Sequence, residues 1–167
     1  MEPLEHPRTA DPACRVRVTE RDGELALVAA VDVAAGGAIL YLDGEIYRRP
    51  TRYSVQVGVG RHVDAPHDVD PKGRANRYVW RFLNHACSPN AVLHERTLVA
   101  NRAIRAGEQV TFDYESNEWD MAEPFACGCG AVDCRGFIRG FRHLDDEVRR
   151  RVLPLASSHV LAMLQQA

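Results

Sequence analysis

Three cysteines near the C-terminal end constrain this chain more than any other feature of its sequence. Cys127, Cys129 and Cys134 lie within eight residues. The Cys-x-Cys pair can chelate one tetrahedral ion, and Gly130 allows the chain to turn back with the third thiolate. Structural zinc is normally four-coordinate, so a fourth ligand must come from elsewhere, and Cys87 is our first expectation. The alternatives at this position are Cys14, His85 and His143.

A site closed by four thiolates leaves no coordination position for a substrate, so the single zinc ion that we expect is structural. It would tie Cys87 to the segment after Trp119 and fasten that segment as a flap beside residues 84–90. Thiolate–metal sites are typical of reducing compartments, and the N-terminus lacks a basic segment followed by an apolar run. We therefore expect a cytoplasmic protein without a signal peptide.

Composition argues against two classes of partner. The formal net charge of −2 disfavours generic binding to nucleic acid or to anionic membranes, which requires a basic surface. The most apolar stretch, residues 25–42, contains Asp32 and does not read as a membrane span. Arginine greatly outnumbers lysine, with Lys72 the only lysine, a bias typical of high-GC and thus bacterial coding sequences. We expect no direct nucleic-acid partner, no membrane partner and a bacterial source.

Short apolar segments predict strands over much of the chain. Turn signals such as Asp22-Gly23 and Asp43-Gly44 separate them. Strands this short and this closely spaced predict a mostly-β fold of small sheets. The expected strands cover residues 15–19, 25–29, 38–42, 53–57, 97–100 and 109–112.

Two of these segments resemble each other. Residues 27–39 and 98–110 share Leu, Val, Ala, Ala and Gly at five aligned positions, and each reads as strand, turn and strand. Chance similarity between two Ala- and Val-rich segments is the alternative. We interpret the pair as two pseudo-symmetric β units.

Helix signals are sparse until the C-terminal end. Residues 70–76 look like a loop. Asp145 and Asp146 can cap a helix that Pro154 ends, and residues 157–166 predict a second short helix.

Three ordered blocks carry a resemblance to a known family. They are Arg-Phe-Leu-Asn-His-Ala-Cys-Ser-Pro-Asn at 81–90, Ala-Gly-Glu-Gln-Val-Thr-Phe-Asp-Tyr at 106–114 and Cys-Gly-Cys-Gly-Ala-Val-Asp-Cys-Arg-Gly at 127–136. Together they resemble the signature blocks of SET-domain protein lysine methyltransferases with a post-SET zinc segment. The resemblance implies the SET-domain fold, in which small curved β-sheets surround a pseudoknot, followed here by the post-SET zinc segment and a short C-terminal helix.

The resemblance also implies a division of the chain. Residues 1–12 would be a flexible N-terminal tail, and residues 13–116 the SET domain, with 45–77 as a variable insert. Residues 117–140 would form the post-SET zinc segment, and residues 141–167 a helical extension.

The family's site residues carry over to the matching positions. Tyr114 would be the catalytic tyrosine beside the transferred methyl group, and Asn84 and His85 would bind the cofactor S-adenosylmethionine at the pseudoknot. Cys87 would complete the zinc site. The other expected cofactor contacts are Phe125, Arg81 and Ala26, and the expected substrate channel contains Phe112, Tyr53 and Tyr41.

Two positions depart from the family pattern. Residues 24–26 read Glu-Leu-Ala where the family usually carries Gly-x-Gly, and residues 42–44 read Leu-Asp-Gly where it often carries Tyr-x-Gly. Tyr41 is one residue early, and in a strand such a shift reverses the face of the side chain. Tyr47 or Tyr53 could supply the missing hydroxyl.

The implied chemistry suits these residue types. Methyl transfer from a sulfonium to an amine is an in-line displacement that depends mainly on positioning, and a dry aromatic channel favours the neutral amine that must attack. The leading interpretation is an S-adenosylmethionine-dependent methyltransferase acting on a protein or peptide lysine. The alternatives are a SET-fold enzyme that methylates a small-molecule amine and a non-catalytic, zinc-containing binding module.

Overall fold

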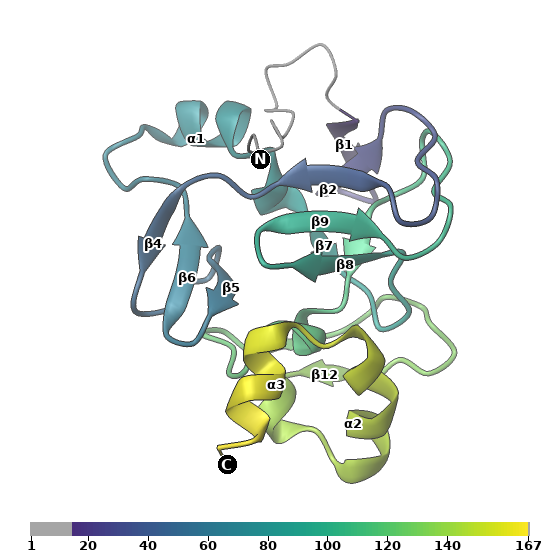
Figure 1. Cartoon of the computed structure of the whole chain (residues 1–167). Coiled ribbons are helices and arrows are strands. Elements are labelled where there is room, and N and C mark those ends of the chain that lie inside the picture. Colours follow the sequence, from purple (N-terminus) through teal and green to yellow (C-terminus); the bar gives the residue numbers. More distant parts are fainter. Residues whose placement is uncertain (1–14, 167) are drawn as a thin grey trace, which may run out of the picture.

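The computed structural model describes residues 15–166. The expected N-terminal tail at 1–12 and Cys14 lie outside the described residues. Small sheets occupy most of the molecule, and the last helices lie together at one end of it (Figure 1). The strands are β1 (Val16–Arg21), β2 (Glu24–Ala29), β3 (Ala38–Tyr41), β4 (Glu45–Tyr47), β5 (Val55–Gly58), β6 (Arg61–Asp64), β7 (Asn84–His85), β8 (Ala91–His94), β9 (Thr97–Ala100), β10 (Thr111–Phe112), β11 (Phe125–Ala126) and β12 (Phe137–Ile138).

A five-stranded sheet in the order β3-β9-β8-β10-β7 lies at the centre of the fold. Its first three strands are antiparallel, whereas β10 pairs parallel with both β7 and β8. Three smaller sheets surround it, namely β1-β2, β4-β6-β5 and β11-β12. Leu27 of β2, Ile39 of β3 and Leu98 of β9 are buried in one apolar cluster that joins two of these sheets. The expected mostly-β fold of small sheets is confirmed.

Strand prediction succeeded where apolar runs were long. All six expected strands are present within a few residues of their predicted limits. The strands without a prediction are β4, β6, β7, β8, β11 and β12, each of two to four residues. Segments this short show no usable period, and their strand structure depends on the strands with which they pair, whether near in the sequence, as for β8 and β9, or distant, as for β7 and β10.

The two similar segments pack against each other as a pseudo-symmetric pair. The equivalent residues Val33 and Ile104 exchange both backbone hydrogen bonds, at 2.8 and 2.9 Å. Gly36 and Gly107 occupy equivalent turn positions with φ angles of 79° and 84°, a left-handed conformation that favours glycine. The predicted pair of strand–turn–strand units is therefore confirmed.

The loop prediction for residues 70–76 was wrong, because helix α1 (Pro71–Arg77) begins there. The Asp70 carboxylate caps the helix by accepting hydrogen bonds from the N–H groups of Lys72 and Gly73, both at 3.0 Å. Proline is favoured at the first helical position, so Asp-Pro is a start signal. No residue of α1 is buried, so the sequence shows no apolar face there.

Two helices form the C-terminal extension, as the sequence predicts. Asp145 caps α2 (Asp146–Val152) by accepting a hydrogen bond from the N–H of Val148 at 2.9 Å. Pro154 lies in a 3₁₀ turn (Leu153–Leu155), and α3 (Ser158–Leu164) follows. Phe141, Val152 and Val160 are buried in a second apolar cluster beneath both helices. Within residues 15–166, no helix has the length and apolarity needed to cross a membrane.

The extension docks on the chain through buried Asn117. The Ser157 hydroxyl lies 2.6 Å from Asn117 Oδ1, and the Ser157 N–H donates to the Ser116 carbonyl at 2.9 Å. His159 Nε2 lies 2.7 Å from the Asn117 carbonyl oxygen. Asn117 Nδ2 in turn donates to the Gln56 carbonyl of β5 at 2.7 Å. The extension therefore stabilises the segment that follows β10, the strand that pairs parallel with β7 and β8.

We predict that Ser157→Ala lowers the free energy of unfolding by about 1 to 3 kcal/mol, because it leaves a buried amide oxygen without its donor. Urea denaturation of the metal-loaded protein measures the loss. Ser158→Ala is the matched control, since this neighbouring hydroxyl is exposed, and we expect a change within about 0.5 kcal/mol. Equal effects of the two substitutions would contradict this account of the docking.

Candidate active site and metal centre

A cleft of about 400 Å³ lies where the β4–β5 connection, the 3₁₀ turn Val79–Phe82, β7, β10 and the chain before β11 meet. Most of the predicted site residues are brought together here, although they come from distant parts of the sequence. The predicted residues that line the cleft are Asn84, Arg81, Phe125, Phe112, Tyr53 and Tyr114.

Aromatic rings form much of the cleft wall. The ring of Tyr114 lies 4.9 Å from that of Phe112 and 5.9 Å from that of Phe125, measured between centroids. Trp80 is almost fully buried and lines the same cleft. Such a wall excludes water and favours a neutral amine, and the ring faces also attract cations.

Tyr114 begins a 3₁₀ turn (Tyr114–Ser116) directly after β10. Its hydroxyl donates a hydrogen bond to the Leu83 carbonyl oxygen at 2.6 Å. Burial, and secondarily the nearby charge of Glu118, raises the pKa of Tyr114 well above its ordinary value. The hydroxyl therefore stays protonated, and it can orient a reacting group but cannot act as a strong base.

His85 links Tyr114 to the cysteines. Its Nδ1 accepts the backbone N–H of Tyr114 at 3.1 Å, so the ring proton lies on Nε2, which is 3.3 Å from Cys87 Sγ. Burial, together with the positive charge of Arg135, lowers the pKa of His85 to about 3. The ring is therefore neutral. Among the described residues, His85 is not one of those that line the cleft. A cofactor contact by His85 stays a prediction.

Asn84 and Ala26 lie near each other on two adjacent segments. Asn84 Nδ2 donates to the Leu25 carbonyl of β2 at 3.2 Å, and Asn84 also lines the cleft. Ala26 is buried, and of this segment it is Glu24 that reaches the described cleft lining. The Glu-Leu-Ala segment that replaces Gly-x-Gly thus contacts the predicted cofactor residue. The role of Ala26 itself stays a prediction.

The tyrosines considered for the missing hydroxyl lie in different surroundings. Tyr53 lines the cleft, with the Arg81 guanidinium 4.4 Å from its ring centroid. Tyr47 stacks on His67 at 4.4 Å, outside the described lining. Tyr41 lies beneath Arg96 and is also absent from that lining, so its predicted place in the substrate channel receives no support from the cleft.

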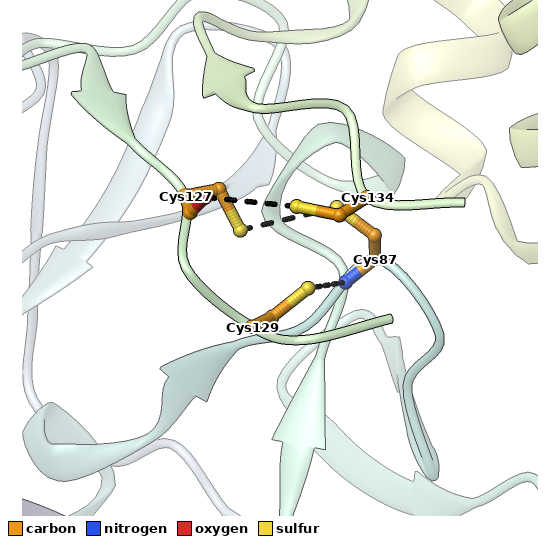
Figure 2. A group of neighbouring side chains, drawn as sticks. All are labelled: Cys87, Cys127, Cys129 and Cys134. Atoms are coloured by element: carbon orange, nitrogen blue, oxygen red, sulfur yellow. Dashed lines mark hydrogen bonds between the residues drawn. The ribbon is translucent and has the colours of Figure 1, made fainter. Parts of the chain in front are cut away.

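The sulfur atoms of Cys87, Cys127, Cys129 and Cys134 all lie within 4.8 Å of one another (Figure 2). Tetrahedral zinc–thiolate bonds of about 2.3 Å place neighbouring sulfurs roughly 3.8 Å apart, and Cys87 Sγ lies 4.0 Å from Cys127 Sγ. His143 pairs with Asp120 instead, at 2.9 Å. Among the described residues, these four cysteines therefore form the set that can hold a metal ion, as the sequence predicts.

The surroundings of the cysteines suit a bound cation. Burial raises the pKa of the Cys87 thiol, and it raises the pKa of Cys127 to about 11. Four neighbouring thiolates thus require a cation to offset their charge. Backbone N–H groups point at the sulfurs, from Arg135 to Cys87 Sγ at 3.4 Å and from Cys87 to Cys129 Sγ at 3.5 Å.

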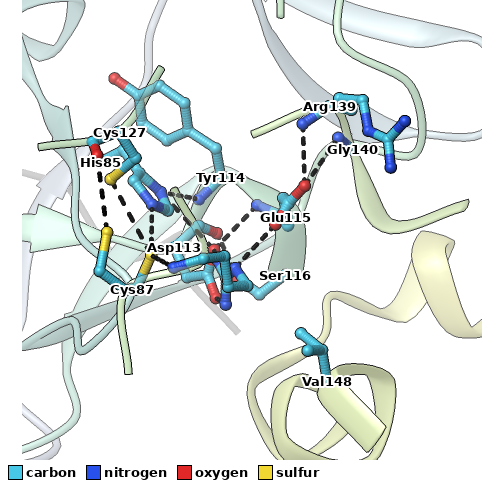
Figure 3. A network of polar contacts seen from close by, with 12 residues as sticks. His85, Cys87, Asp113, Tyr114, Glu115, Ser116, Cys127, Arg139, Gly140 and Val148 are labelled. Carbon is cyan, nitrogen blue, oxygen red and sulfur yellow. Dashed lines mark hydrogen bonds and ion pairs between the residues drawn. The ribbon is translucent and has the colours of Figure 1, made fainter. Parts of the chain in front are cut away.

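A buried ion network fastens the cysteine segment to the chain around Tyr114 (Figure 3). Arg135 Nη1 donates to Asp113 Oδ2 at 2.9 Å, and Arg135 Nε lies 2.8 Å from Glu115 Oε2. Glu115 Oε1 accepts the backbone N–H groups of Arg139 at 2.9 Å and Gly140 at 3.1 Å. Burial raises the pKa of Asp113 to about 6, against the opposing effect of Arg135.

Sequence reasoning missed four of the charged residues at this site. Asp113 and Arg135 lie inside the quoted blocks, next to Tyr114 and Cys134, and their opposite charges beside two predicted site residues were a usable signal. Glu115 and Glu118 follow the second block without any local pattern. Only the fold shows that their carboxylates are buried.

Comparison with known proteins places this geometry in context. Residues 47–115 match the family model described as "SET domain". Methyltransferase flvH of Aspergillus flavus is 32% identical over 107 residues, which cover 62% of this chain and 54% of the relative. An H3 lysine-36-specific histone-lysine N-methyltransferase of Yarrowia lipolytica is 32% identical over 145 residues, covering 73% of this chain and 18% of the relative. The chain thus spans about half of the first relative and less of the second.

Two solved structures share the fold of this chain. The methyltransferase domain of human histone-lysine N-methyltransferase SETMAR gives a TM-score of 0.53 at 17% identity, covering 72% of this chain and 56% of that one. KRYPTONITE in complex with mCHG DNA and SAH gives a TM-score of 0.55 at 22% identity, covering 73% and 28%. The fold class implied by the three sequence blocks is confirmed. The two curated relatives are fungal, so a bacterial source stays a prediction.

We predict that the purified protein carries one tightly bound metal ion per chain and that Cys129→Ser loses it. Elemental analysis by mass spectrometry gives the ratio of metal to protein, and thermal unfolding shows the accompanying loss of stability, since metal binding is coupled to folding. Cys14→Ser is the control and should keep the ion. Retention of the metal by Cys129→Ser, or its loss from Cys14→Ser, would refute the four-cysteine site.

Proposed function

We propose that this chain, whose residues 47–115 match the SET-domain family model, is an S-adenosylmethionine-dependent methyltransferase whose substrate is the side-chain amine of a protein lysine. Several relatives are named as histone-lysine N-methyltransferases, among them the H3 lysine-36-specific protein of Yarrowia lipolytica and an H3 lysine-4-specific protein of Schizosaccharomyces pombe. Those names describe the relatives, and their substrates enter here as support for lysine as a class.

The observation that carries the proposal is the place of Tyr114. Its hydroxyl and ring lie in the wall of a cleft that also contains Asn84 and Phe125, two of the predicted cofactor residues. A methyl transfer needs donor and acceptor aligned in one water-poor site, and it needs no covalent nucleophile on the protein. An aromatic cleft with one oriented hydroxyl meets these requirements.

Different residues of the cleft meet the requirements for excluding water and for orienting the reacting groups. Phe112, Phe125 and Trp80 exclude water from the reacting amine, which favours its neutral form. The Tyr114 hydroxyl, fixed by its bond to Leu83, keeps lone pairs that can accept a hydrogen bond, so it can orient the amine or the methyl group. S-adenosylmethionine, when bound, supplies the activated methyl group.

The metal ion that we propose is zinc, held by the four cysteines as in a post-SET segment. Four thiolates are a typical ligand set for structural zinc and leave no place for a substrate. The ion would contribute to folding and not to chemistry. Phe125 lies two residues before Cys127, so ordering the cysteine segment also holds this ring at the cleft wall.

We further propose a cytoplasmic location. The four cysteines of the cluster are free thiols arranged as metal ligands, an arrangement typical of reducing compartments. The absence of a direct nucleic-acid partner rests on the net charge of −2 alone and stays a prediction, because one structural relative is itself a DNA complex.

A small-molecule amine is the second candidate substrate. Methyltransferase flvH, whose name mentions no histone, has more of its length covered by this chain than the histone-lysine relatives described above. Leu42 and the Glu-Leu-Ala segment also depart from the pattern of lysine methyltransferases. The same cleft chemistry applies, and only the acceptor differs.

We predict that the purified protein transfers label from methyl-labelled S-adenosylmethionine to protein bands of a whole bacterial extract or of mixed histones. Tyr114→Phe should lower the rate by roughly 100-fold or more, because it removes the orienting hydroxyl. Tyr47→Phe is the matched control and should keep full activity, since this hydroxyl lies outside the cleft and bonds to Glu45.

The distribution of label separates the candidate functions. Label in protein bands supports the lysine proposal, whereas label confined to the small-molecule fraction supports the second candidate. Folded, metal-loaded protein that labels neither fraction would overturn both and leave a binding module. Thermal unfolding of Tyr114→Phe shows whether the variant is folded.

A further inference from the structure

One buried carboxylate lines the cleft and has no role in the function described so far. Glu118 is 6% exposed and contributes to the cleft wall beside Tyr114. The other acidic residues that line the cleft are exposed, and Glu123 pairs with Arg52 at 3.6 Å. Glu118 is thus the acidic group that the fold holds inside the cleft.

Hydrogen bonds to one of its two carboxylate oxygens hold the Glu118 side chain in place. Its Oε1 accepts the backbone N–H of Gln56 at 2.7 Å and the side-chain amide of Asn117 at 3.1 Å. Within residues 15–166, Oε2 accepts no hydrogen bond from a side chain or from a backbone N–H group. Arg81, a cationic residue of the cleft wall, pairs with Asp64 instead, at 3.5 Å. The carboxylate is therefore fixed in direction while its second oxygen remains available.

The surroundings of Glu118 suit a cationic ligand. Burial raises the pKa of Glu118 to about 7, although the hydrogen bonds from Gln56 and Asn117 act in the opposite direction. A buried carboxylate without a cation is unfavourable, and the aromatic rings of Trp80 and Tyr114 in the same cleft also attract positive charge. A ligand with a cationic head and an apolar stem would satisfy both the carboxylate and the rings.

We propose that Glu118 binds the ammonium group of the substrate and thereby selects substrates that carry an unbranched alkylammonium chain. This inference rests on the proposed function and names a residue that sets its specificity. Glu118 lies beyond residues 47–115, the part of the chain that matches the family model.

The carboxylate also explains how a bound cation becomes a nucleophile. In the cleft, Oε2 accepts one proton from the ammonium, so that one N–H bond breaks and one O–H bond forms. The neutral amine then holds its lone pair toward the methyl group. In the displacement, the N–C bond forms while the S–C bond breaks, and the sulfonium becomes a neutral thioether. Charge is conserved, because the positive charge passes to the methylated amine.

The test measures binding of n-butylammonium chloride by calorimetry at pH 8, with S-adenosylhomocysteine present. We expect wild-type protein to bind n-butylammonium at least 10-fold more tightly than neutral 1-butanol, which has nearly the same shape. Glu118→Gln keeps the acceptor for Gln56 and removes the charge, so it should weaken n-butylammonium binding at least 10-fold and leave 1-butanol unchanged. Glu147→Gln, an exposed site on α2, is the matched control and should bind as wild type does.

Wild-type protein that binds n-butylammonium and 1-butanol equally would overturn the proposal, and this result does not depend on any variant being folded. Equal n-butylammonium binding by wild type and Glu118→Gln would also overturn it. With a labelled lysine substrate, Glu118→Gln should raise KM at least 10-fold while its affinity for S-adenosylhomocysteine is unchanged. Absence of methyl transfer by wild type would refute the proposed function, whereas the calorimetry would still decide whether Glu118 binds the cation.

Discussion

The attachment of the cysteine segment to the chain around Tyr114 is the constraint on which the cleft depends. Two interactions make it: the cluster that Cys87 shares with the three later cysteines, and the ion network in which Arg135 joins Asp113 to Glu115. The neutral ring of His85 connects them, since it accepts the Tyr114 N–H and faces Cys87 Sγ. Without this attachment, the segment that carries Phe125 would have no fixed place, and the cleft would lose one wall. A metal ion held by the four cysteines would therefore stabilise the shape of the cleft without lying in its wall.

The C-terminal extension acts on another part of the same cleft, the part that contains Glu118. Ser157 and His159 hold buried Asn117, whose amide reaches both Gln56 and Glu118. Through these bonds, α3 helps to fix the direction of the Glu118 carboxylate. The extension is therefore more than a cap on the apolar cluster around Phe141. It connects the last helices to the carboxylate inside the cleft through hydrogen bonds that span 40 positions from Ser157 to Asn117 and 61 from Asn117 to Gln56.

The sequence predicted what local chemistry decides and missed what tertiary contacts decide. Cysteine spacing predicted three of the four clustered cysteines, and the apolar runs predicted the main strands, because both signals are local. Cys87, forty residues earlier in the chain, was the first expectation among several candidates for the fourth position. Two-residue strands such as β7 and β11 form only because each finds a partner strand, so no period reveals them. Helix α1 was missed since it has no buried face to leave a pattern. Glu118 was missed for a related reason: a glutamate reads as a surface residue until the fold shows Gln56 and Asn117 bonded to it.

One of the two departures from the family pattern, at Leu42, has a structural explanation in the core. Leu42 occupies the position where the family often has tyrosine, and its side chain is 0% exposed within the main apolar cluster. A tyrosine there would need a partner for its hydroxyl, which an apolar cluster does not supply. Tyr41 belongs to the opposite face and lies beneath Arg96. Among the described residues, the tyrosines that line the cleft are Tyr114 and Tyr53, which is 51% exposed and lies under the Arg81 guanidinium. Tyr53 lies in the connection between β4 and β5, so this part of the cleft wall comes from a connection and not from the core. That part of the wall can therefore change without disturbing the core.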